Sequence, residues 1–263
     1  MKKDIWKYIV SVIVVAVLLI IITDMAYVGK NKGKIWLHKA YPLEKLDALK
    51  EYYPNVEIDV VMREDGRFDI THWEDKTLGI GIEPYMEYLR DNGECKMWLD
   101  VKNLNEKTDS LMKIRLDSIC DRYGIEKGRL IVESKNWELL GTFTEDGYYT
   151  SCYVEEDSPK GMTEEEVEKV MERLRKVADS GKVRALSFAG WWYDTMKEKL
   201  GRSDIGLLTW KHRSTELELM LTPEGHRMVE DEQLKVVLVK DIRLLREVIG
   251  KKYRQEYRDY KED

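Results

Sequence analysis

The chain has 263 residues and a hydrophobic content of 43%, enough to bury the core of a single α/β barrel, which needs about 250 residues. Charged residues make up 36%, but the two signs nearly balance, with a net charge of -6 and an isoelectric point near 5.5. This balance excludes a strongly basic face, so we expect no nucleic-acid partner. The three cysteines, Cys95, Cys120 and Cys152, lack C-x-x-C spacing and predict neither a disulfide framework nor a zinc site.

The first element is an uncharged run from Tyr8 to Thr23, preceded by lysines and followed by Asp24. At about 1.5 Å per residue, a helix of this length falls slightly short of a ~30 Å hydrocarbon core, but Trp6 and Tyr27 can lie at the two interfaces. The run is apolar on all sides, which disfavours a buried core helix with a single apolar stripe. The sequence therefore predicts one transmembrane helix and a membrane partner.

The alternative is a cleaved signal peptide, but the DMAYVGK segment that follows has no A-x-A-like cleavage site. Lys2, Lys3 and Lys7 precede the run, and the positive-inside rule places them in the cytoplasm. Residues 1–28 are then a cytoplasmic tip with its anchor, and residues 29–33 are a polar linker. We expect the rest of the chain on the extracytoplasmic side of a cell membrane that it crosses once.

From residue 34 onward, short β-type runs alternate with amphipathic helical segments, which is typical of repeated βα units around a parallel sheet. The eight predicted strands span residues 34–38, 56–62, 96–102, 129–134, 148–154, 183–188, 205–210 and 234–240. The predicted helices include residues 43–52, 83–91, 106–123 and 163–178. The last of these opens with a capping box of Thr163 and Glu166. Eight units predict an α/β fold, a (β/α)8 TIM barrel over residues 34–250, followed by a charged tail at residues 251–263.

Glu57 and Asp59 lie two residues apart on the second predicted strand, so their side chains point to the same face. In a barrel this face is the lumen near the carboxyl-terminal rim, where active sites of this architecture are assembled. The segment REDGR then turns the chain and brings His72 back toward the same rim. We therefore expect two acids and an imidazole at one mouth. The alternative is a half-buried hairpin with exposed acids.

Other strand ends add groups to the same rim. His38 ends the first strand, and Asp100 and Lys102 share a face at the end of the third. Asp100 can complete a three-carboxylate oxygen site with Glu57 and Asp59, a ligand set that suits a hard cation, Mg²⁺ or Ca²⁺. Lys102 can add positive charge beside the metal. The alternative is that Asp100 and Lys102 form an internal ion pair that only orients the barrel wall.

Weaker candidates for ligand contact lie at the ends of the later strands. They are Glu133 and Ser134 on the fourth strand, Tyr153 on the fifth, Trp210 and Lys211 on the seventh and Lys240 on the eighth. Trp191 and Trp192 follow the sixth strand, where they either line an apolar or sugar-binding wall or cap the barrel. Taken singly, each of these residues is also compatible with a purely structural role.

The segment EIDVVMREDGRFDITH, residues 57–72, resembles the E-x-D-V, D-G, H signature of the glycerophosphodiester phosphodiesterases. The order and spacings match, with Glu57, Asp59 and His72 at signature positions. The resemblance implies a metal-dependent phosphoric diester hydrolase that acts on a glycerophosphodiester, a lysophospholipid or a phosphodiester-linked envelope component. A small phosphodiester or a lipid head group is therefore the expected partner.

Two further strand ends carry the resemblance. His38 and Lys39 stand where the family has a His-Arg pair. Asp100-x-Lys102 stands where it has E-x-K, and it also resembles the motif of the sphingomyelinase-D-type phospholipases. The chain departs from the family pattern after Lys39, because the Pro-Glu-Asn-Thr segment is absent. Lysine also does not reproduce the bidentate grip of arginine on a phosphate.

The mechanism implied by this resemblance is metal-assisted attack on a phosphodiester, with the three acids holding the cation. His38 and His72 would flank the phosphorus. One would accept a proton from the attacking oxygen and the other would protonate the leaving oxygen, a division that suits imidazole. Lys102 would act beside them as a third catalytic group. The predicted substrate contacts are Lys39, Glu133 and Trp210.

A second resemblance, to the menorin-like branch of the same superfamily, supplies the alternative function. That branch carries a W-x-H near its start and an L-D-x-K-N stretch, which this chain matches at Trp36-x-His38 and at residues 99–103. This resemblance implies a non-catalytic, membrane-tethered TIM-barrel binding module. The complete set of acids and histidines favours the enzyme.

Overall fold

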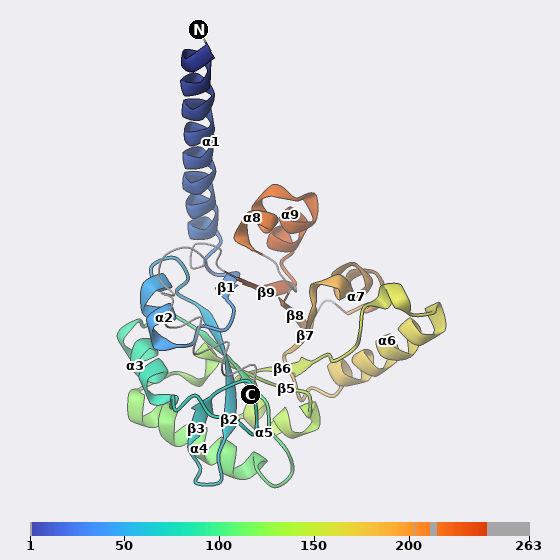
Figure 1. Cartoon of the computed structure of the whole chain (residues 1–263). Helices are drawn as coiled ribbons and strands as arrows, with labels where there is room; N and C mark the ends of the chain where they lie inside the picture. The colour runs from blue at the N-terminus through green and yellow to red at the C-terminus, as the bar shows by residue number, and fades with distance from the viewer. Residues whose placement is uncertain (1, 203, 211–214, 241–263) are drawn as a thin grey trace.

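The computed structural model describes residues 2–202, 204–210 and 215–240, and eight parallel strands in these ranges form a closed barrel (Figure 1). Closure follows from the pairing of β1 with both β2 and β9. The barrel strands are β1 (Ile35–Leu37), β2 (Val56–Met62), β4 (Met97–Val101), β5 (Leu130–Ser134), β6 (Tyr149–Tyr153), β7 (Ala185–Ala189), β8 (Gly206–Trp210) and β9 (Leu234–Val239). The predicted strands and the TIM-barrel fold are confirmed, with small differences at the strand ends.

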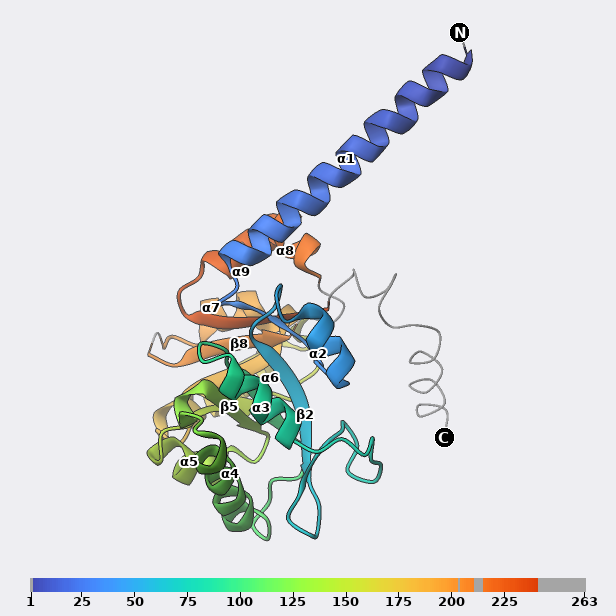
Figure 2. The same ribbon diagram turned by 90° about the vertical axis from the view of Figure 1, so that its left-hand side faces the viewer.

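Helices flank the barrel and contribute buried apolar residues to the main core, and the last two lie at the end from which the amino-terminal helix leaves (Figures 1 and 2). They are α2 (Leu43–Leu49), α3 (Glu83–Asp91), α4 (Asp109–Tyr123), α5 (Gly141–Glu145), α6 (Glu164–Asp179), α7 (Tyr193–Lys199), α8 (Glu216–Leu221) and α9 (Pro223–Glu230), with 3-10 turns η1 (Lys127–Arg129), η2 (Trp137–Leu140), η3 (Pro159–Gly161) and η4 (Gly190–Trp192). The capping box predicted for α6 is confirmed. The Thr163 hydroxyl accepts from the Glu166 backbone N–H, and the Glu166 carboxylate accepts from that of Thr163.

The lumen of the barrel is filled by a separate apolar cluster. Its members are Trp36, Trp98, Ile131, Ala185, Leu208, Val236 and Leu238. They come from alternate positions of their strands, because successive side chains of a strand point to opposite faces. The side chains on the outer face join the helices in the main core. The lumen is therefore a packed layer that supports the polar rim at the carboxyl ends of the strands.

One βα unit departs from simple alternation. A short antiparallel strand, β3 (Phe68–Ile70), follows β2 and pairs with its end before the chain reaches α3. Gly66 in the connecting turn has a φ of +77°, a conformation that glycine adopts at little cost. The predicted turn at REDGR is therefore present, and the chain after β3 returns His72 toward the rim.

The amino-terminal helix α1 (Lys2–Lys30) projects away from the barrel (Figures 1 and 2). The apolar side chains described along it are largely exposed. Its last turns contact the barrel: Val28 is buried, and the Tyr27 ring packs against His226 of α9 with 6.0 Å between ring centroids. Among the described residues, none of the helices combines the length and the apolar character needed to cross a membrane.

The position of α1 relative to the strands is set by its junction with β1. Lys34, in the connecting turn, donates from Nζ to the backbone carbonyls of Val229 and Asp231, each at 2.6 Å. The junction therefore lies at the amino end of β1, and in a parallel barrel all amino ends share one end. Figure 2 shows α1 leaving beside α8 and α9, opposite the β2–β3 hairpin. The predicted tail, residues 251–263, and residues 241–250 of the predicted barrel lie outside the described residues.

Candidate active site

Side chains at the carboxyl ends of the strands surround a cavity of about 310 Å³. All residues given a catalytic, metal-binding or substrate-binding role from the sequence line it, namely His38, Lys39, Glu57, Asp59, His72, Asp100, Lys102, Glu133 and Trp210. The weaker candidate Ser134 is buried and does not line it. Lys211, another of the weaker candidates, lies outside the residues that the structure describes. Trp98, Tyr153, Leu238 and Lys240 complete the wall. A larger cavity of about 910 Å³ lies beside the β2–β3 hairpin, but neither histidine and none of the three proposed metal ligands lines it. We therefore place the candidate active site in the smaller cavity, where the assigned roles stay predictions.

Carboxyl groups meet at the centre of this cavity. In the sheet register Asp59 of β2 is level with Asp100 of β4, which is level with Glu133 of β5. Glu57 lies on the same inward face of β2 as Asp59. One oxygen each from Glu57, Asp59 and Asp100 lies within 4.8 Å of the others. The acids outnumber the two lysines that contact them, so the cluster fits a hard cation bound by carboxylate oxygens.

The carboxylate of Asp59, only 1% exposed, is held by protein groups in place of water. The Tyr41 hydroxyl donates to Oδ2 at 2.5 Å, and Lys102 Nζ lies 2.6 Å from Oδ1. His72 Nδ1 and Lys39 Nζ approach Oδ2 at 3.1 and 3.3 Å. Burial opposes ionisation, but the hydrogen bond from His72 and the two ammonium groups outweigh it and lower the pKa of Asp59 well below its usual range. Asp59 is therefore ionised.

Glu57 and His38 form a second contact, of different electrostatic character. His38 Nε2 lies 3.6 Å from Glu57 Oε2. Burial and the charges of Asp59 and Asp100 raise the pKa of Glu57 to about 8. Burial and the Lys39 ammonium lower the pKa of His38 to about 3. Both groups are therefore mostly uncharged at neutral pH, and we interpret their contact as polar rather than as an ion pair.

The turn after β1 is shaped by hydrogen bonds between its backbone and two ionisable side chains. Lys39 has a φ of +52°, a left-handed conformation that costs a residue with a side chain about 1–2 kcal/mol. Its N–H donates to Glu57 Oε2 at 2.7 Å, and the Lys45 ammonium donates to the carbonyls of His38 and Lys39. These bonds offset the strain and turn both the backbone and the side chain of Lys39 toward the acids. Lys45 and Tyr41 were not predicted, because no sequence spacing connects them with the rim.

Lys102 bridges Asp59 and Asp100. The ion pair between Asp100 and Lys102, which the sequence offered as the alternative to a metal site, is therefore present. Burial disfavours the ammonium, but the two carboxylates outweigh this effect and raise the pKa of Lys102. Burial also raises the pKa of Asp100, and Lys102 opposes that rise. Because Glu57 and Glu133 add further carboxyl groups, the ion pair and a cation site are compatible.

An aromatic wall borders the cavity on the side of the later strands. The rings of Tyr153 and Trp210 are parallel to within 2°, with centroids 5.8 Å apart, and Trp191 meets Trp210 edge-on at 6.0 Å. Trp192 is buried and donates its indole N–H to the Asp157 carbonyl at 2.9 Å. Of the two neighbouring tryptophans, Trp191 thus joins the aromatic wall, whereas Trp192 packs in the core.

Three polar atoms of the lining residues are buried without a hydrogen-bond partner in the part of the chain that the structure describes. They are the indole nitrogens of Trp98 and Trp210 and Oε2 of Glu133. Burial and the charge of Asp100 raise the pKa of Glu133 well above its usual range, which favours the protonated carboxyl group, and in this form Glu133 can donate. Three buried donors without acceptors suit a ligand that is rich in oxygen atoms.

The cavity adjoins a side chamber of about 390 Å³. The two spaces share His72, Asp100, Lys102 and Tyr153. The other residues of the side chamber are Trp73, Glu74, Asp75, Val101, Lys135 and Glu155. His72, whose side chain is 42% exposed, therefore lies between the two spaces and can contact a ligand that extends into both.

No protein-family model and no curated protein matches this sequence, whereas solved structures match its fold. A glycerophosphodiester phosphodiesterase from Parabacteroides distasonis shares 12% identity, covering 86% of this chain and 97% of that chain, with a TM-score of 0.54. A phosphodiesterase from Oleispira antarctica, in complex with the product sn-glycerol-3-phosphate, shares 14% identity, covering 88% and 97%, with a TM-score of 0.53. The chain therefore shares its TIM-barrel fold with these phosphodiesterases, and the resemblance predicted from the sequence is confirmed at the level of the fold.

Mg²⁺ or Ca²⁺ should raise the melting temperature of the protein, because a ligand that binds the folded state alone stabilises it by mass action. The Glu57→Gln/Asp59→Asn variant should lose this shift. The Glu64→Gln/Asp65→Asn variant makes the same change of charge on exposed residues of the hairpin and should keep it. Thermal unfolding with and without the cation measures both, and equal shifts in the two variants would contradict the metal site.

The cation-induced shift should also depend on pH. The pKa of Glu57 is raised to about 8, so this group carries a proton at lower pH that a cation has to displace. Cation binding is therefore coupled to proton release, and the melting-temperature shift should be larger at about pH 9 than at about pH 6. A shift that is constant over this range would exclude Glu57 as a ligand with a raised pKa.

Proposed function

We propose that this protein is a metal-dependent phosphoric diester hydrolase that cleaves a glycerophosphodiester or a related phosphodiester. One observation carries the proposal. His38 and His72 approach the paired acids Glu57 and Asp59 within a single cavity at the carboxyl ends of the barrel strands. The fold that the chain shares with solved phosphodiesterases supports the same class of reaction.

The charged side chains have distinct tasks in this proposal. Glu57, Asp59 and Asp100 would hold a divalent cation, Mg²⁺ or Ca²⁺, which when bound supplies Lewis-acid stabilisation of the charge on the phosphate oxygens. Lys39 and Lys102 place ammonium groups beside the acids and attract the anionic phosphodiester into the cavity. The site therefore combines positive charge for the phosphate with carboxylates for the cation.

We assign the base to His38 and the acid to His72. The neutral imidazole of His38 can accept the proton of an attacking water, and an anionic phosphodiester beside it would raise its lowered pKa. Asp59 holds Nδ1 of His72, which leaves Nε2 available for the leaving oxygen. A new P–O bond forms from the water oxygen as the ester P–O bond breaks, and the alcohol leaves with a proton from His72.

The cavity and its side chamber suit the two alcohol groups that are esterified to the phosphate of a diester. The phosphate would lie near His72, which borders both spaces. One alcohol group would lie beside the ring of Trp210 and the unpartnered donors of Trp98 and Glu133, an environment that suits the hydroxyl groups of glycerol. The other alcohol group would extend into the side chamber beside Trp73.

We further propose that α1 tethers the protein to the cell membrane as a single-pass anchor, with the barrel on the extracytoplasmic side. The exposed apolar side chains of α1 and the lysines at its start support this location. Because α1 joins the amino end of β1, the cavity at the carboxyl ends faces away from a bilayer that holds α1. This orientation favours a soluble glycerophosphodiester or an envelope component over a lysophospholipid in the same bilayer.

The two histidines can be tested by substitution. His38→Ala and His72→Ala should each lower cation-dependent turnover of a glycerophosphodiester by about 10²-fold or more, the usual effect of losing a general acid or base. The double variant should resemble the worse single variant, because the two groups act in one transition state. Steady-state hydrolysis of a panel of phosphodiesters with Mg²⁺ or Ca²⁺ measures the effect.

His226→Ala is the matched control for this experiment. The His226 ring lies against Tyr27 and the Met220 carbonyl, remote from the cavity, so its loss should leave turnover unchanged. Near-wild-type turnover by either folded His38 or His72 variant would refute the two-histidine mechanism. An inactive wild-type protein that still responds to the cation would instead support the binding module.

The anchor is tested by fractionation. The intact protein should stay with membranes after a high-salt wash, because salt does not screen hydrophobic insertion. A chain that starts at Ala26 keeps Tyr27 and Val28, which contact the barrel, and it should be recovered in the soluble fraction. Immunoblots of pellet and supernatant measure both outcomes. Recovery of the full-length chain in the soluble fraction after ordinary lysis would end the anchor hypothesis.

A further inference from the structure

His72 is carried by a loop, residues 71–79, that leaves the barrel after β3 and returns before α3. Backbone pairing closes the base of this loop. The Ile70 N–H donates to the Ile80 carbonyl at 2.8 Å, and the Thr71 N–H donates to the Asp59 carbonyl at 3.2 Å. These bonds fix where the loop begins and ends. The position of His72 within the loop depends on what holds the residues that follow it.

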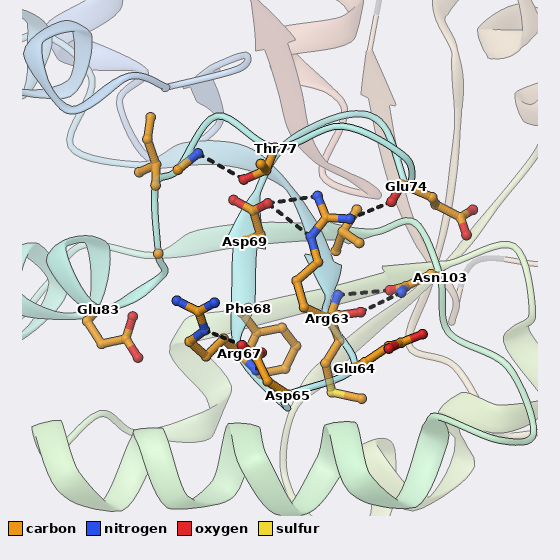
Figure 3. Close-up of a pocket in the computed structure, with 15 residues that line it drawn as sticks. Arg63, Glu64, Asp65, Arg67, Phe68, Asp69, Glu74, Thr77, Glu83 and Asn103 are labelled. Atoms are coloured by element: carbon orange, nitrogen blue, oxygen red, sulfur yellow. Dashed lines mark hydrogen bonds and ion pairs between the residues drawn. The ribbon is translucent and has the colours of Figure 1, made fainter.

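Arg63, the first residue after β2, spans the loop from the side of the hairpin (Figure 3). Its Nε and Nη2 donate to Asp69 Oδ2 at 3.0 and 2.7 Å. Its Nη1 also donates to the Glu74 carbonyl, and its Nη2 to the Lys76 carbonyl. One guanidinium therefore connects the stem of the hairpin with two points of the loop beyond His72.

The chemistry of this connection requires arginine. The side chains of Arg63 and Asp69 are 25% and 9% exposed, so the pair is largely shielded from water. A guanidinium presents five donors in fixed directions, whereas a lysine ammonium is a single point and cannot reach acceptors on both sides of the pair together. The loop carbonyls that Arg63 binds would lose a charged donor if it were replaced.

The loop segment that Arg63 holds follows closely after His72, the proposed general acid. The Glu74 carbonyl lies two residues beyond His72, and the Trp73 ring meets the His72 ring edge-on at 5.3 Å. His72 Nδ1 in turn lies 3.1 Å from Asp59. A shift of the loop would therefore move the imidazole relative to Asp59 and to the phosphate beside it.

We propose that Arg63 is a positioning residue that holds the loop so that His72 meets the leaving oxygen of the substrate; this inference rests on the proposed function. Arg63 touches no reacting group, because it lines the larger cavity beside the hairpin rather than the catalytic one. It acts by holding the Glu74 and Lys76 carbonyls in place, and this effect is distinct from its electrostatic attraction to Asp69.

Arg63→Lys in the full-length protein separates geometry from charge. This variant keeps a positive charge beside Asp69 but loses the fork that holds the two loop carbonyls. It should lower kcat for glycerophosphodiester hydrolysis by about tenfold to a hundredfold, the effect expected when a catalytic group is displaced by up to ~1 Å, with a smaller change in KM. The cation-induced rise in melting temperature should persist, because the acids are unchanged. Arg67→Lys, in the exposed pair with Asp65 on the same hairpin, is the matched control and should keep wild-type kcat.

A second variant guards against an effect of unfolding. Arg63→Met combined with Asp69→Leu removes both members of the pair and leaves no unpaired buried carboxylate, so the barrel should stay folded. It should show a similar loss of kcat. Amide hydrogen exchange across residues 71–79 should be faster in both Arg63 variants and unchanged in Arg67→Lys. The proposal is wrong if both Arg63 variants match Arg67→Lys in kcat, or if exchange in the loop does not change.

The exchange measurement distinguishes this inference from the function on which it rests. A wild-type protein without hydrolase activity would end the proposed function. Hydrogen exchange would still report on the loop, since it requires no turnover. Unchanged exchange in the Arg63 variants of such a protein would overturn the role of Arg63 as well, and faster exchange would show that Arg63 orders the His72 loop.

Discussion

The side chain of Asp59 is only 1% exposed. A buried carboxylate is tolerated only where charged and polar donors replace the water that it has lost. The donors around Asp59 come from separate parts of the chain: Lys39 and Tyr41 from the turn after β1, His72 from the loop after β3, and Lys102 from the end of β4. All of them must reach one carboxylate. The same interaction therefore fixes the relative positions of Lys39, His72 and Lys102, three of the groups that the proposed reaction uses.

The cavity has two halves with different electrostatic character. Around Asp59 the charges are compensated, whereas Glu57 and Glu133 have raised pKa values because they are buried beside other carboxyl groups. His38 lies in this second half and has a lowered pKa. A cation would change the balance, because it favours the ionised form of Glu57 and so couples metal binding to proton release. The protein thus holds Glu57 largely protonated at neutral pH, in a form that a divalent cation would convert into a ligand.

The β2–β3 hairpin shows how a local departure from the barrel pattern serves the site. By adding β3, the chain gains a loop that carries His72 back over the rim and a stem from which Arg63 can reach that loop. The short motif spacing from Glu57 to His72 was enough to predict the turn and the return of the imidazole. It gave no indication of the contact between Arg63 and Asp69, because a charged pair on a hairpin is more often exposed than shielded.

The sequence by itself determined the eight strands and the inward direction of Glu57 and Asp59, because strand length, turn residues and side-chain alternation are local properties of the chain. It also placed the ends of the first and third strands at a common rim, since parallel strands of a barrel end together. Only the tertiary structure decided that Tyr41 meets Asp59, that His38 is uncharged, and that Trp191 rather than its neighbour faces the aromatic wall. These outcomes depend on burial and on contacts between residues that are not related by any fixed spacing, and burial is a property of the assembled barrel rather than of any segment within it.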